Sequence, residues 1–334
     1  MLNQLPDSFA IFRLPNQTQT YQVTGKCSSE PTSISQIKEN AFLISNFNQG
    51  SEAYFIPFNQ LENYEADDSF SCQFKANEYN DLGEAHYIEI VEKAIVQMKA
   101  NHFQKVVLAN TKNIPCLHFD PKKLLDKIQE AYPSAFIYWY STPQTGTWIG
   151  ATPEPLLTNE DSTYNTVALA GTMLKSESKK WSHKEIMEQK MVEDFIIENL
   201  NKYQISFTQN GPFDYTSGNL LHLKTEFKFN TQNKLQSAVD FLAAINPTPA
   251  VAGFPVTNAL QFINKEEGFI RSCYAGFVGF KIENNLQLFV NLRCLQWQKE
   301  TITLFAGAGI TADSNAKLEW KETQNKMETL AKFL

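Results

Sequence analysis

The chain has 334 residues, 43% of them hydrophobic, which is enough for a core in two average domains or in one large α/β or α+β domain. Its formal net charge is −7 at pH 7 and it contains no basic run, so the composition argues against nucleic-acid binding and favours a small ligand. The N-terminus "MLNQLPDSFAIFRLPNQ" lacks a cationic region before an apolar stretch, and no window approaches the roughly 20 apolar residues of a membrane span, so we expect a cytoplasmic protein without a membrane partner.

The first 75 residues alternate short apolar runs with polar turns. The runs are "FAIFRL", "AFLISNF" and "AYFIPF", and their pattern indicates β-hairpins. The segment "YNDLGEAHYIEIVEKAIVQMKANH" then places Ile90, Ala94, Ile95 and Met98 on one stripe, which predicts a helix. The apolar run in "KVVLAN" predicts a buried strand directly after it.

Helices and strands alternate irregularly through the rest of the chain. A helix at about 120–131 precedes the β-type runs "AFIYWY", "TWIGATPEPLLT" and "TYNTVALAGT". Ser182 and Glu185 form a capping box at the start of a predicted helix over 182–202. Two further helices, "SAVDFLAAI" and "VTNALQFINKEE", flank the proline-rich loop "NPTPAVAGFP". The strands "YAGFVGFKI", "LQLFVNLRCLQW" and "TITLFAGAG" precede a last helix that starts near Asn315.

Consecutive strands with inserted helices favour an α+β fold of antiparallel sheets flanked by helices over regular βαβ alternation. No linker-like composition and no repeat divides the sequence. We therefore predict a single domain over residues 1–334, with a β-rich part at 1–75 and the motif-bearing part at 85–334.

The five cysteines do not form a recognisable motif. They are Cys27, Cys72, Cys116, Cys273 and Cys294, and none of their spacings is C-x-x-C. An odd number without such spacing indicates neither a disulfide framework nor a zinc site. We expect buried, reduced thiols.

A glycine motif near the C-terminus fits the pattern G-x-G-x-x-A. It lies in "TLFAGAGITA", residues 303–312, and contains Gly307 and Gly309. A dinucleotide site needs a helix and then a second strand after these glycines, whereas the sequence from Asn315 onward predicts one helix and no strand. The motif is therefore not expected to bind a dinucleotide, and its glycines must serve another purpose.

Two predicted helices carry the pattern E-x-x-E. Glu185 and Glu188 lie on one of them, and Glu319 and Glu322 lie on the other. Residues at i and i+3 share a helix face, so two such helices could direct four carboxylates at one point. An all-oxygen set of this kind suits Mg²⁺. Because solvated helix faces carry the same pattern, it leaves both interpretations open.

Three single residues are unusual in their surroundings. Lys105 begins the apolar run "VVLA", and a lysine held in a desolvated site near other cations loses proton affinity and can act as a base. Glu154 follows "WIGATP", where an apolar wall could hold a carboxyl protonated. Arg293 lies inside "VNLRCLQW", and a buried arginine there would need an anionic partner. Each residue also has an ordinary structural interpretation, and the positions alone do not decide.

At these residues the chain resembles the chorismate-utilising enzymes, which include isochorismate, anthranilate, aminodeoxychorismate and salicylate synthases. Ten segments match in the family's order over about 105–326. They are "KVVLAN", "WIGATPEPLL", "ALAGT", "HKEIMEQ", "LLHLKT", "NPTPAVAGFP", "EGFIRSCYAGFVGF", "NLRC", "LFAGAGI" and "EWKETQNK". Asn110 and Gln189 depart from the usual pattern, which affects only the residues that support the site.

The resemblance implies two packed antiparallel sheets with outer helices, and a Mg²⁺-dependent reaction of chorismate. It implies that Glu188 and Glu322 bind the magnesium ion directly, while Glu185 and Glu319 reach the ion or its waters. It also implies that Arg293 and the backbone around the glycines bind the enolpyruvyl carboxylate. The substrate-binding residues carried over in this way are Gly171, Thr172, His222, Tyr274, Arg293, Gly307, Ala308, Gly309 and Lys326.

Two positions in the resemblance distinguish reaction types. Anthranilate synthases tend to have glutamine at the position of Lys105, and aminodeoxychorismate synthases have a lysine nucleophile at the position of Ala170. Lys105 with Ala170 therefore implies water as nucleophile and an isochorismate synthase, in which Lys105 is the general base and Glu154 the general acid. The alternatives are a salicylate synthase, a non-catalytic chorismate-binding relative, and an amidotransferase subunit. No motif for an obligatory protein partner is visible.

Overall fold

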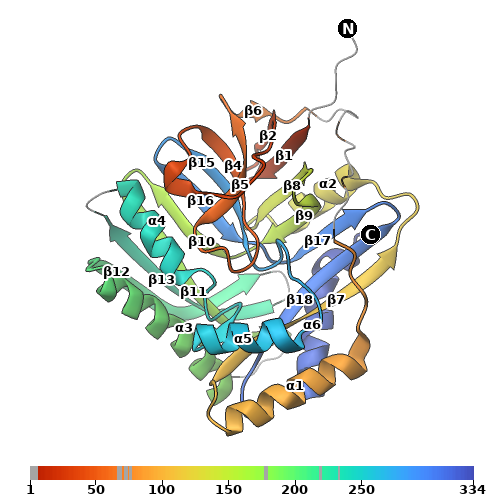
Figure 1. Cartoon of the computed structure of the whole chain (residues 1–334), viewed down its shortest axis with the longest axis vertical. Helices are drawn as coiled ribbons and strands as arrows, with labels where there is room; N and C mark the ends of the chain where they lie inside the picture. Colours follow the sequence, from red (N-terminus) through yellow and green to blue (C-terminus); the bar gives the residue numbers. More distant parts are fainter. Residues whose placement is uncertain are drawn as a thin grey trace.

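The computed structural model describes residues 7–65, 70, 74, 77–176, 180–217, 220–231 and 234–334. Within this part of the chain two antiparallel sheets of nine strands face each other, and helices cover their outer faces (Figure 1). The predicted α+β class with two packed antiparallel sheets is confirmed. Residues 7–65 contain the first six strands in chain order, which belong to both sheets.

The first sheet contains the strand that begins at Lys105 and the strand that carries the glycine motif, side by side. Its order is β14-β7-β18-β17-β9-β8-β1-β2-β6. The strands are β1 (Ser8–Arg13), β2 (Thr20–Gly25), β6 (Glu62–Asn63), β7 (Lys105–Pro115), β8 (Phe136–Thr142), β9 (Gly146–Thr152), β14 (Gly253–Phe254), β17 (Cys294–Gln298) and β18 (Thr301–Ile310).

The second sheet contains the strand that carries "ALAGT". Its order is β12-β13-β11-β10-β16-β15-β4-β5-β3. The strands are β3 (Thr32–Ser33), β4 (Asn40–Ile44), β5 (Glu52–Phe58), β10 (Pro155–Glu160), β11 (Thr163–Leu174), β12 (Phe207–Ser217), β13 (Leu220–Asn230), β15 (Phe277–Ile282) and β16 (Asn285–Val290). A 3₁₀ turn at Ile34–Gln36 follows β3.

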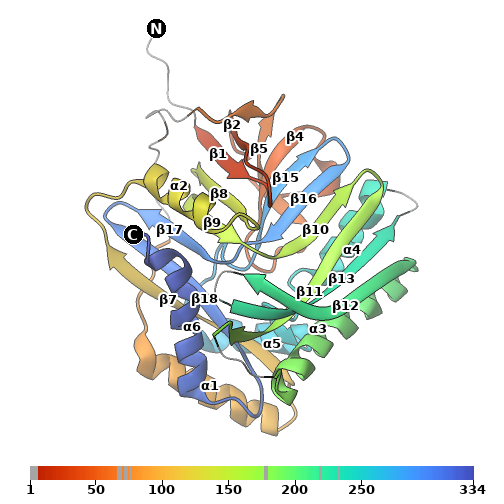
Figure 2. The same cartoon turned by 180° about the vertical axis from the view of Figure 1, so that it is seen from behind.

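The predicted helices are all present. They are α1 (Gly83–Lys99), α2 (Pro121–Ala131), α3 (His183–Lys202), α4 (Lys234–Ile245), α5 (Val256–Glu266) and α6 (Ala316–Ala331). Helix α2 packs on β8 and β9, α5 on β7, and α6 on β18 and α1, whereas α3 packs on β11 and β13. Figure 2 shows α3 and α6 on either side of the region where β11 and β18 approach.

Local sequence explains where the helices start. Asp120 accepts a hydrogen bond from the Lys123 amide at the start of α2, and Asn315 accepts from two amides at the start of α6. The predicted capping box of Ser182 and Glu185 is confirmed at the start of α3. The caps of α3 and α6 fix the first turns of these helices, which carry Glu185 and Glu319, and Glu188 and Glu322 follow one turn later.

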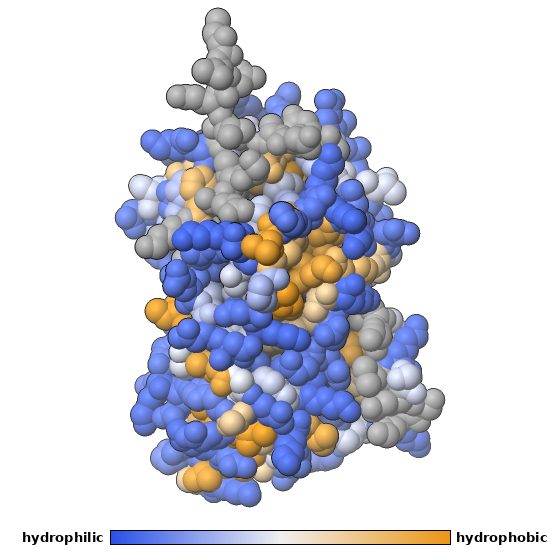
Figure 3. All heavy atoms as spheres, turned by 90° about the vertical axis from the view of Figure 1, so that its right-hand side faces the viewer, coloured by the Kyte–Doolittle hydropathy of each residue, from blue (hydrophilic) through white to orange (hydrophobic). Residues whose placement is uncertain are grey.

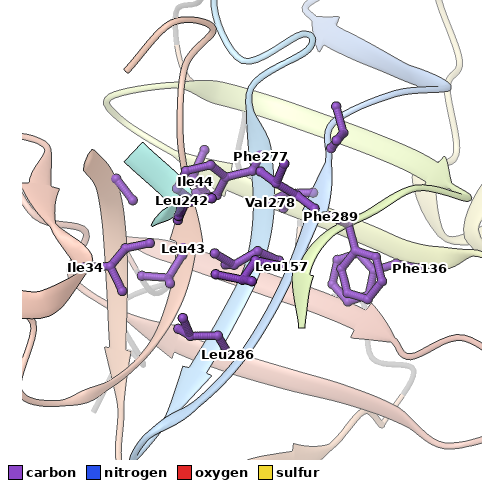
Figure 4. Packing of buried hydrophobic residues seen from close by; sticks show 14 of the residues in the cluster. Ile34, Leu43, Ile44, Phe136, Leu157, Leu242, Phe277, Val278, Leu286 and Phe289 are labelled. Carbon is purple, nitrogen blue, oxygen red and sulfur yellow. The ribbon is translucent and has the colours of Figure 1, made fainter. Parts of the chain in front are cut away.

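The largest apolar cluster fills the space between the sheets. Strand β1 is buried on both faces, so Phe12 packs between the sheets while Phe9 packs in the smaller cluster under α2. Figure 4 shows part of this core, where Phe136 of the first sheet stacks on Phe289 of the second with ring centroids 4.4 Å apart. Burial of such large side chains holds the two sheets together.

Two predicted strands are broken where the chain passes from one sheet to the other, which corrects the sequence-based prediction. The run "TWIGATPEPLLT" is divided into β9 and β10, and "LQLFVNLRCLQW" is divided into β16 and β17. Arg293 at the second break has a left-handed backbone with φ of 48°, which ends the extended run. Backbone hydrogen bonds join the breaks, because Val290 N donates to Glu154 O and Ala151 N donates to Arg293 O. The two crossings therefore place Glu154 and Arg293 together between the sheets.

The face of the molecule drawn in Figure 3 is mostly polar, with apolar atoms gathered near its middle, and most of the described cysteines are buried. Among the described residues, none of the helices combines the length and apolarity required to cross a membrane. Cys27, Cys273 and Cys294 are buried free thiols and Cys116 is a partly exposed one, whereas Cys72 lies outside the described residues.

Candidate active site

A cavity between the two sheets brings together most of the residues named from the sequence. It lies where β11, β18 and the two sheet crossings meet α3 and α6. Of the residues proposed from the sequence, its lining includes Glu154, Gly171, Thr172, Glu188, His222, Tyr274, Arg293, Gly307, Gly309 and Lys326. The remaining walls are mainly apolar, from Val107, Leu169, Ala170, Val251, Leu292 and Phe305.

Lys105 lies directly behind this lining. It is the first residue of β7 and is 0% exposed. Its Nζ lies 2.9 Å from Oε1 of Glu188, which reaches across from α3. Burial alone would raise the pKa of Glu188, but the positive charges of Lys105 and Lys184 outweigh burial and hold that pKa below its usual value. The pair therefore couples a buried amine to a carboxylate on the cavity wall.

Glu154 is the buried carboxyl of the cavity. It follows the β9 crossing and is 5% exposed. Burial raises its pKa to about 7, although Lys105, Lys326 and Arg293 act in the opposite direction. A carboxyl with this pKa is protonated in a large fraction of molecules near neutral pH, so it can donate a proton to a bound substrate.

His222 on β13 presents a hydrogen-bond acceptor to the cavity. Its Nδ1 lies 2.9 Å from the carbonyl oxygen of Gly171, and because a carbonyl only accepts, Nδ1 carries the proton. Burial and the charge of Arg293 lower the pKa of His222 to about 3, so the ring is neutral at physiological pH. Its buried Nε2 has no partner among the described residues. The ring can accept a hydrogen bond from a substrate hydroxyl or a water but cannot act as a cationic acid.

Two cationic side chains, Lys326 and Arg293, line the cavity. Lys326 on α6 donates to the carbonyl of Gly307 over 2.8 Å and lies 2.6 Å from Glu322. Arg293 donates to the hydroxyl of Thr329 over 3.2 Å, which leaves further guanidinium N–H groups toward the cavity. Together they provide a positive wall for an anionic ligand.

The glycine motif forms the part of β18 that faces the cavity. Because the carbonyl of Gly307 is bound by Lys326, and N–H and C=O of one strand residue point to the same side, the Gly307 amide also points away from β7. Ala308 instead pairs with Leu108 and its side chain belongs to the core under α1. The side chain of Ala308, predicted at the substrate site, therefore does not line the cavity, since alternation along the strand directs it to the opposite face.

Gly309 provides space for the Lys105–Glu188 pair, which gives a testable prediction. A β-carbon at this position would collide with the Glu188 carboxylate and lie 3.2 Å from Cε of Lys105. We expect Gly309→Ala to fold but to lose turnover by about 10²-fold, the loss that a displacement of roughly 1 Å causes. Gly307→Ala is the comparison, because the β-carbon added there would come no closer than 3.1 Å to a neighbouring atom, the hydroxyl oxygen of Tyr274. Equal turnover of Gly309→Ala and the wild type would refute this role of Gly309.

The four glutamates proposed for the metal are divided between two cavities, the one described above and a second cavity that adjoins it. Glu185, Glu319 and Glu322 line the adjoining cavity, Glu188 lines the first, and Thr172 and Lys326 line both. Glu322 is paired with Lys326, and Glu185 accepts from Ser182 in the capping box. Within the described part of the chain, no group of three His, Cys, Asp or Glu residues has the arrangement of a metal centre.

Lys184 is a site residue that the sequence analysis missed. Its Nζ lies 2.6 Å from Glu319, and burial of the lysine is outweighed by Glu319, Glu188 and Glu322, which raise its pKa. Its place one residue before Glu185, four before Glu188, was a signal that could have identified it. Since all four acidic residues are oxygen donors on two neighbouring helices, their chemistry fits a hard divalent ion that takes over the charge now balanced by lysines.

Comparison with known proteins places the chain in a family. The family model described as "Chorismate binding enzyme" matches residues 28–334. Isochorismate synthase EntC of Escherichia coli (strain K12) is 28% identical over 260 residues, covering 72% of this chain and 65% of EntC. Isochorismate synthase MenF of Haemophilus influenzae is 29% identical over 254 residues, covering 73% of this chain and 59% of MenF. The matched part thus spans slightly less than two thirds of these relatives.

Solved structures share the fold over nearly the whole chain. MenF, the menaquinone-specific isochorismate synthase from Escherichia coli, superposes with a TM-score of 0.83 at 19% identity, covering 99% of this chain and 90% of that one. Anthranilate synthase component I from Streptococcus pneumoniae TIGR4 superposes with a TM-score of 0.72 at 17% identity, covering 99% and 93%. The fold is therefore common to enzymes of different reactions, and the match of the family model shows that the chain belongs to the chorismate binding enzyme family.

Proposed function

We propose that the chain is an isochorismate synthase that converts chorismate to isochorismate with Mg²⁺. The observation that carries the proposal is that one cavity has both the fully buried Lys105 behind its lining and the buried Glu154, whose pKa is raised to about 7, in its wall. This is the combination that addition of water and loss of a hydroxyl require, because one step needs a base and the other an acid. The isochorismate synthases among the relatives support the same choice.

The residues divide the reaction between them. Lys105, in its neutral form, takes a proton from a water as the water oxygen bonds to C2 of the ring, the ring double bonds shift, and the bond from C4 to its hydroxyl breaks. Glu154 gives its proton to that hydroxyl, which leaves as water. The amine thus ends with one more proton and the carboxyl with one fewer, and exchange with solvent restores both. Each proton transfer contributes roughly 10²–10⁴-fold to the rate.

Other residues bind and orient the substrate. The guanidinium of Arg293 and the Gly307 amide suit the enolpyruvyl carboxylate, and Nε2 of His222 suits a ring hydroxyl or the attacking water. Glu188 and Glu322 would hold Mg²⁺, with Glu185 and Glu319 beside them. The bound ion supplies positive charge that neutralises the ring carboxylate.

Ala170 supports water rather than an amine as the nucleophile. Its side chain lines the cavity and bears no nitrogen, and its backbone amide is held by Gln189. No lysine of this strand is therefore available to attack the ring.

The products distinguish this function from its alternatives. Purified protein incubated with chorismate, Mg²⁺ and ammonium should yield isochorismate as the main product after chromatographic separation. Salicylate together with pyruvate would identify a salicylate synthase instead, and anthranilate or aminodeoxychorismate would contradict water as nucleophile. Binding of chorismate without conversion would indicate a non-catalytic relative.

Removal of the metal ion should abolish turnover. We expect chelation to stop the reaction, Mg²⁺ to restore it, and Glu322→Gln to lower both Mg²⁺ affinity and turnover by at least about 10–100-fold, the loss seen even for outer partners of a metal. Isothermal titration with Mg²⁺ measures the affinity directly. Glu328→Gln on the same helix is the control, because Glu328 is exposed and lines neither of the two cavities. Unchanged turnover in excess chelator would contradict the magnesium proposal.

A further inference from the structure

A buried ion pair lies behind the cavity, outside the residues that the proposed reaction uses. Glu267 follows α5 and Arg271 lies four residues later, and they are 1% and 3% exposed. The Arg271 guanidinium donates two hydrogen bonds to the Glu267 carboxylate, one from Nε over 2.7 Å and one from a terminal nitrogen over 2.6 Å. Burial alone would lower the pKa of Arg271, but the Glu267 carboxylate outweighs burial and raises it, so the guanidinium stays charged.

The pair replaces a strand at the edge of the first sheet. Strand β14 pairs with Lys105 and Val106, and within the described part of the chain β7 has no neighbouring strand on that side beyond these two residues. There the Ala109 amide donates to Glu267 over 2.6 Å, and the carbonyl of Val107 accepts from Arg271 over 2.6 Å. Two side chains thus satisfy the backbone groups that a longer β14 would bind.

The same arginine joins three walls of the cavity. Besides Val107 it binds the carbonyl of Val251 over 2.8 Å, and its own carbonyl accepts from the Tyr274 amide over 3.0 Å. Its guanidinium lies 5.9 Å from the centre of the Tyr274 ring. Val107, Val251 and Tyr274 all line the cavity, and Val107 is two residues from Lys105 on the same strand. Among the described residues, every hydrogen bond that this guanidinium donates therefore ends at Glu267 or at a segment that forms the cavity, while its nearest ring is that of Phe47, with the ring centre at 4.4 Å.

From this arrangement we infer that Arg271, held by Glu267, is a positioning residue that fixes β7, the Val251 loop and Tyr274 relative to one another. A buried ion pair gives little net stability compared with apolar residues of similar size, so stability alone does not account for it. Its five directed bonds instead define a geometry, and a lysine could not reproduce this fork. The inference rests on the proposed function, because the position that matters is that of Lys105 relative to bound chorismate.

The matched experiment compares two buried arginines. Arg13 is 5% exposed and likewise donates to backbone carbonyls, at Gln129, Tyr132 and Pro133, none of which lines the candidate active-site cavity. We expect Arg271→Lys to lower kcat by about 10²-fold with little change in KM, and Arg13→Lys to leave both unchanged per folded molecule. Glu267→Gln with Arg271→Met removes both charges, keeps an acceptor for the Ala109 amide, and should show the same loss of kcat.

A second readout does not depend on turnover. Hydrogen exchange of the amides in 105–109 and 250–254 should become about 10-fold faster in Arg271→Lys, because a hydrogen bond from a charged group contributes about 1.5–3 kcal/mol, and should stay unchanged in Arg13→Lys. If the wild type makes no isochorismate while Arg271→Lys still exchanges faster than the wild type, the proposed function is refuted and the positioning role stands. Folded Arg271→Lys with wild-type kcat and exchange would overturn the inference, as would equal losses in both arginine variants.

Discussion

Lys105→Gln is expected to lower the rate of isochorismate formation by about 10²–10⁴-fold, the contribution of a general base. Lys105 is fully buried beside Glu188, so removal of the side chain would leave a carboxylate without its partner. Glutamine retains an N–H donor for that carboxylate but cannot take up a proton. The variant should therefore stay folded and keep its contacts to substrate and metal.

The measurement separates kcat from KM, because loss of a base acts on turnover far more than on binding. Lys112→Gln on the same strand is the control, since Lys112 lies outside the cavity. Near wild-type turnover of Lys105→Gln would exclude Lys105 as the base. A rise in KM that accounts for the whole effect would make it a binding residue instead.

Glu154→Gln is expected to lower the rate of isochorismate formation by a factor of similar size, because it removes the general acid rather than the base. In the free enzyme the carboxyl donates only while protonated, and its pKa is about 7, so kcat/KM should fall as pH rises through about 7. The glutamine variant should lose about 10²–10⁴-fold at pH 6 and should lack this decline. Glu160→Gln, an exposed residue of β10, is the control. A wild-type profile without a decline near pH 7 would argue against Glu154 as the acid.

The same carboxyl should make stability depend on pH. Burial raises the folded pKa of Glu154 to about 7 from the usual 4.5 of a glutamate, so between these two pH values the folded protein keeps a proton that the unfolded chain has released. Its contribution to stability is complete below pH 4.5 and is lost as pH rises through 7. At pH 8 Glu154→Gln should therefore be more stable than the wild type, by up to about 3 kcal/mol at 1.36 kcal/mol per pH unit. Thermal unfolding at pH 5 and pH 8 tests this, and an equal shift at both values would contradict it.

The sequence predicted the elements well where the pattern was local. The stripe of Ile90, Ala94 and Met98 is buried in α1, and the capping box marks the start of α3. Local patterns did not reveal the two sheet crossings, because apolar runs on either side of Pro153 and Arg293 look continuous. Which sheet a strand joins depends on partners that are distant in sequence. The resemblance to a family supplied the two-sheet arrangement that periodicity could not.

For the candidate site too, some residues could be identified from the sequence and others only from the fold. Motif order identified Glu154, Glu188 and Lys326, which the structure brings to one cavity. Strand alternation was the missing information for Ala308, which faces the core. Glu267 and Arg271 were beyond reach, because an E-x-x-x-R spacing occurs on many exposed helices and only the fold buries this one. The charged partner of Lys105 also depended on how α3 lies against β7.

The long pairing of β7 with β18 determines when this protein can become active during its synthesis. The two strands pair from Val106 with Ile310 to Pro115 with Thr301, so partners lie about 200 residues apart at one end. Closing so large a loop makes this contact slow to form, in keeping with the high contact order of the fold. A nascent chain that has not yet produced β18 holds Lys105 and the apolar run after it without their neighbour. Until then this strand edge lacks its partner, and an unpaired apolar strand edge is a general site for pairing with other chains.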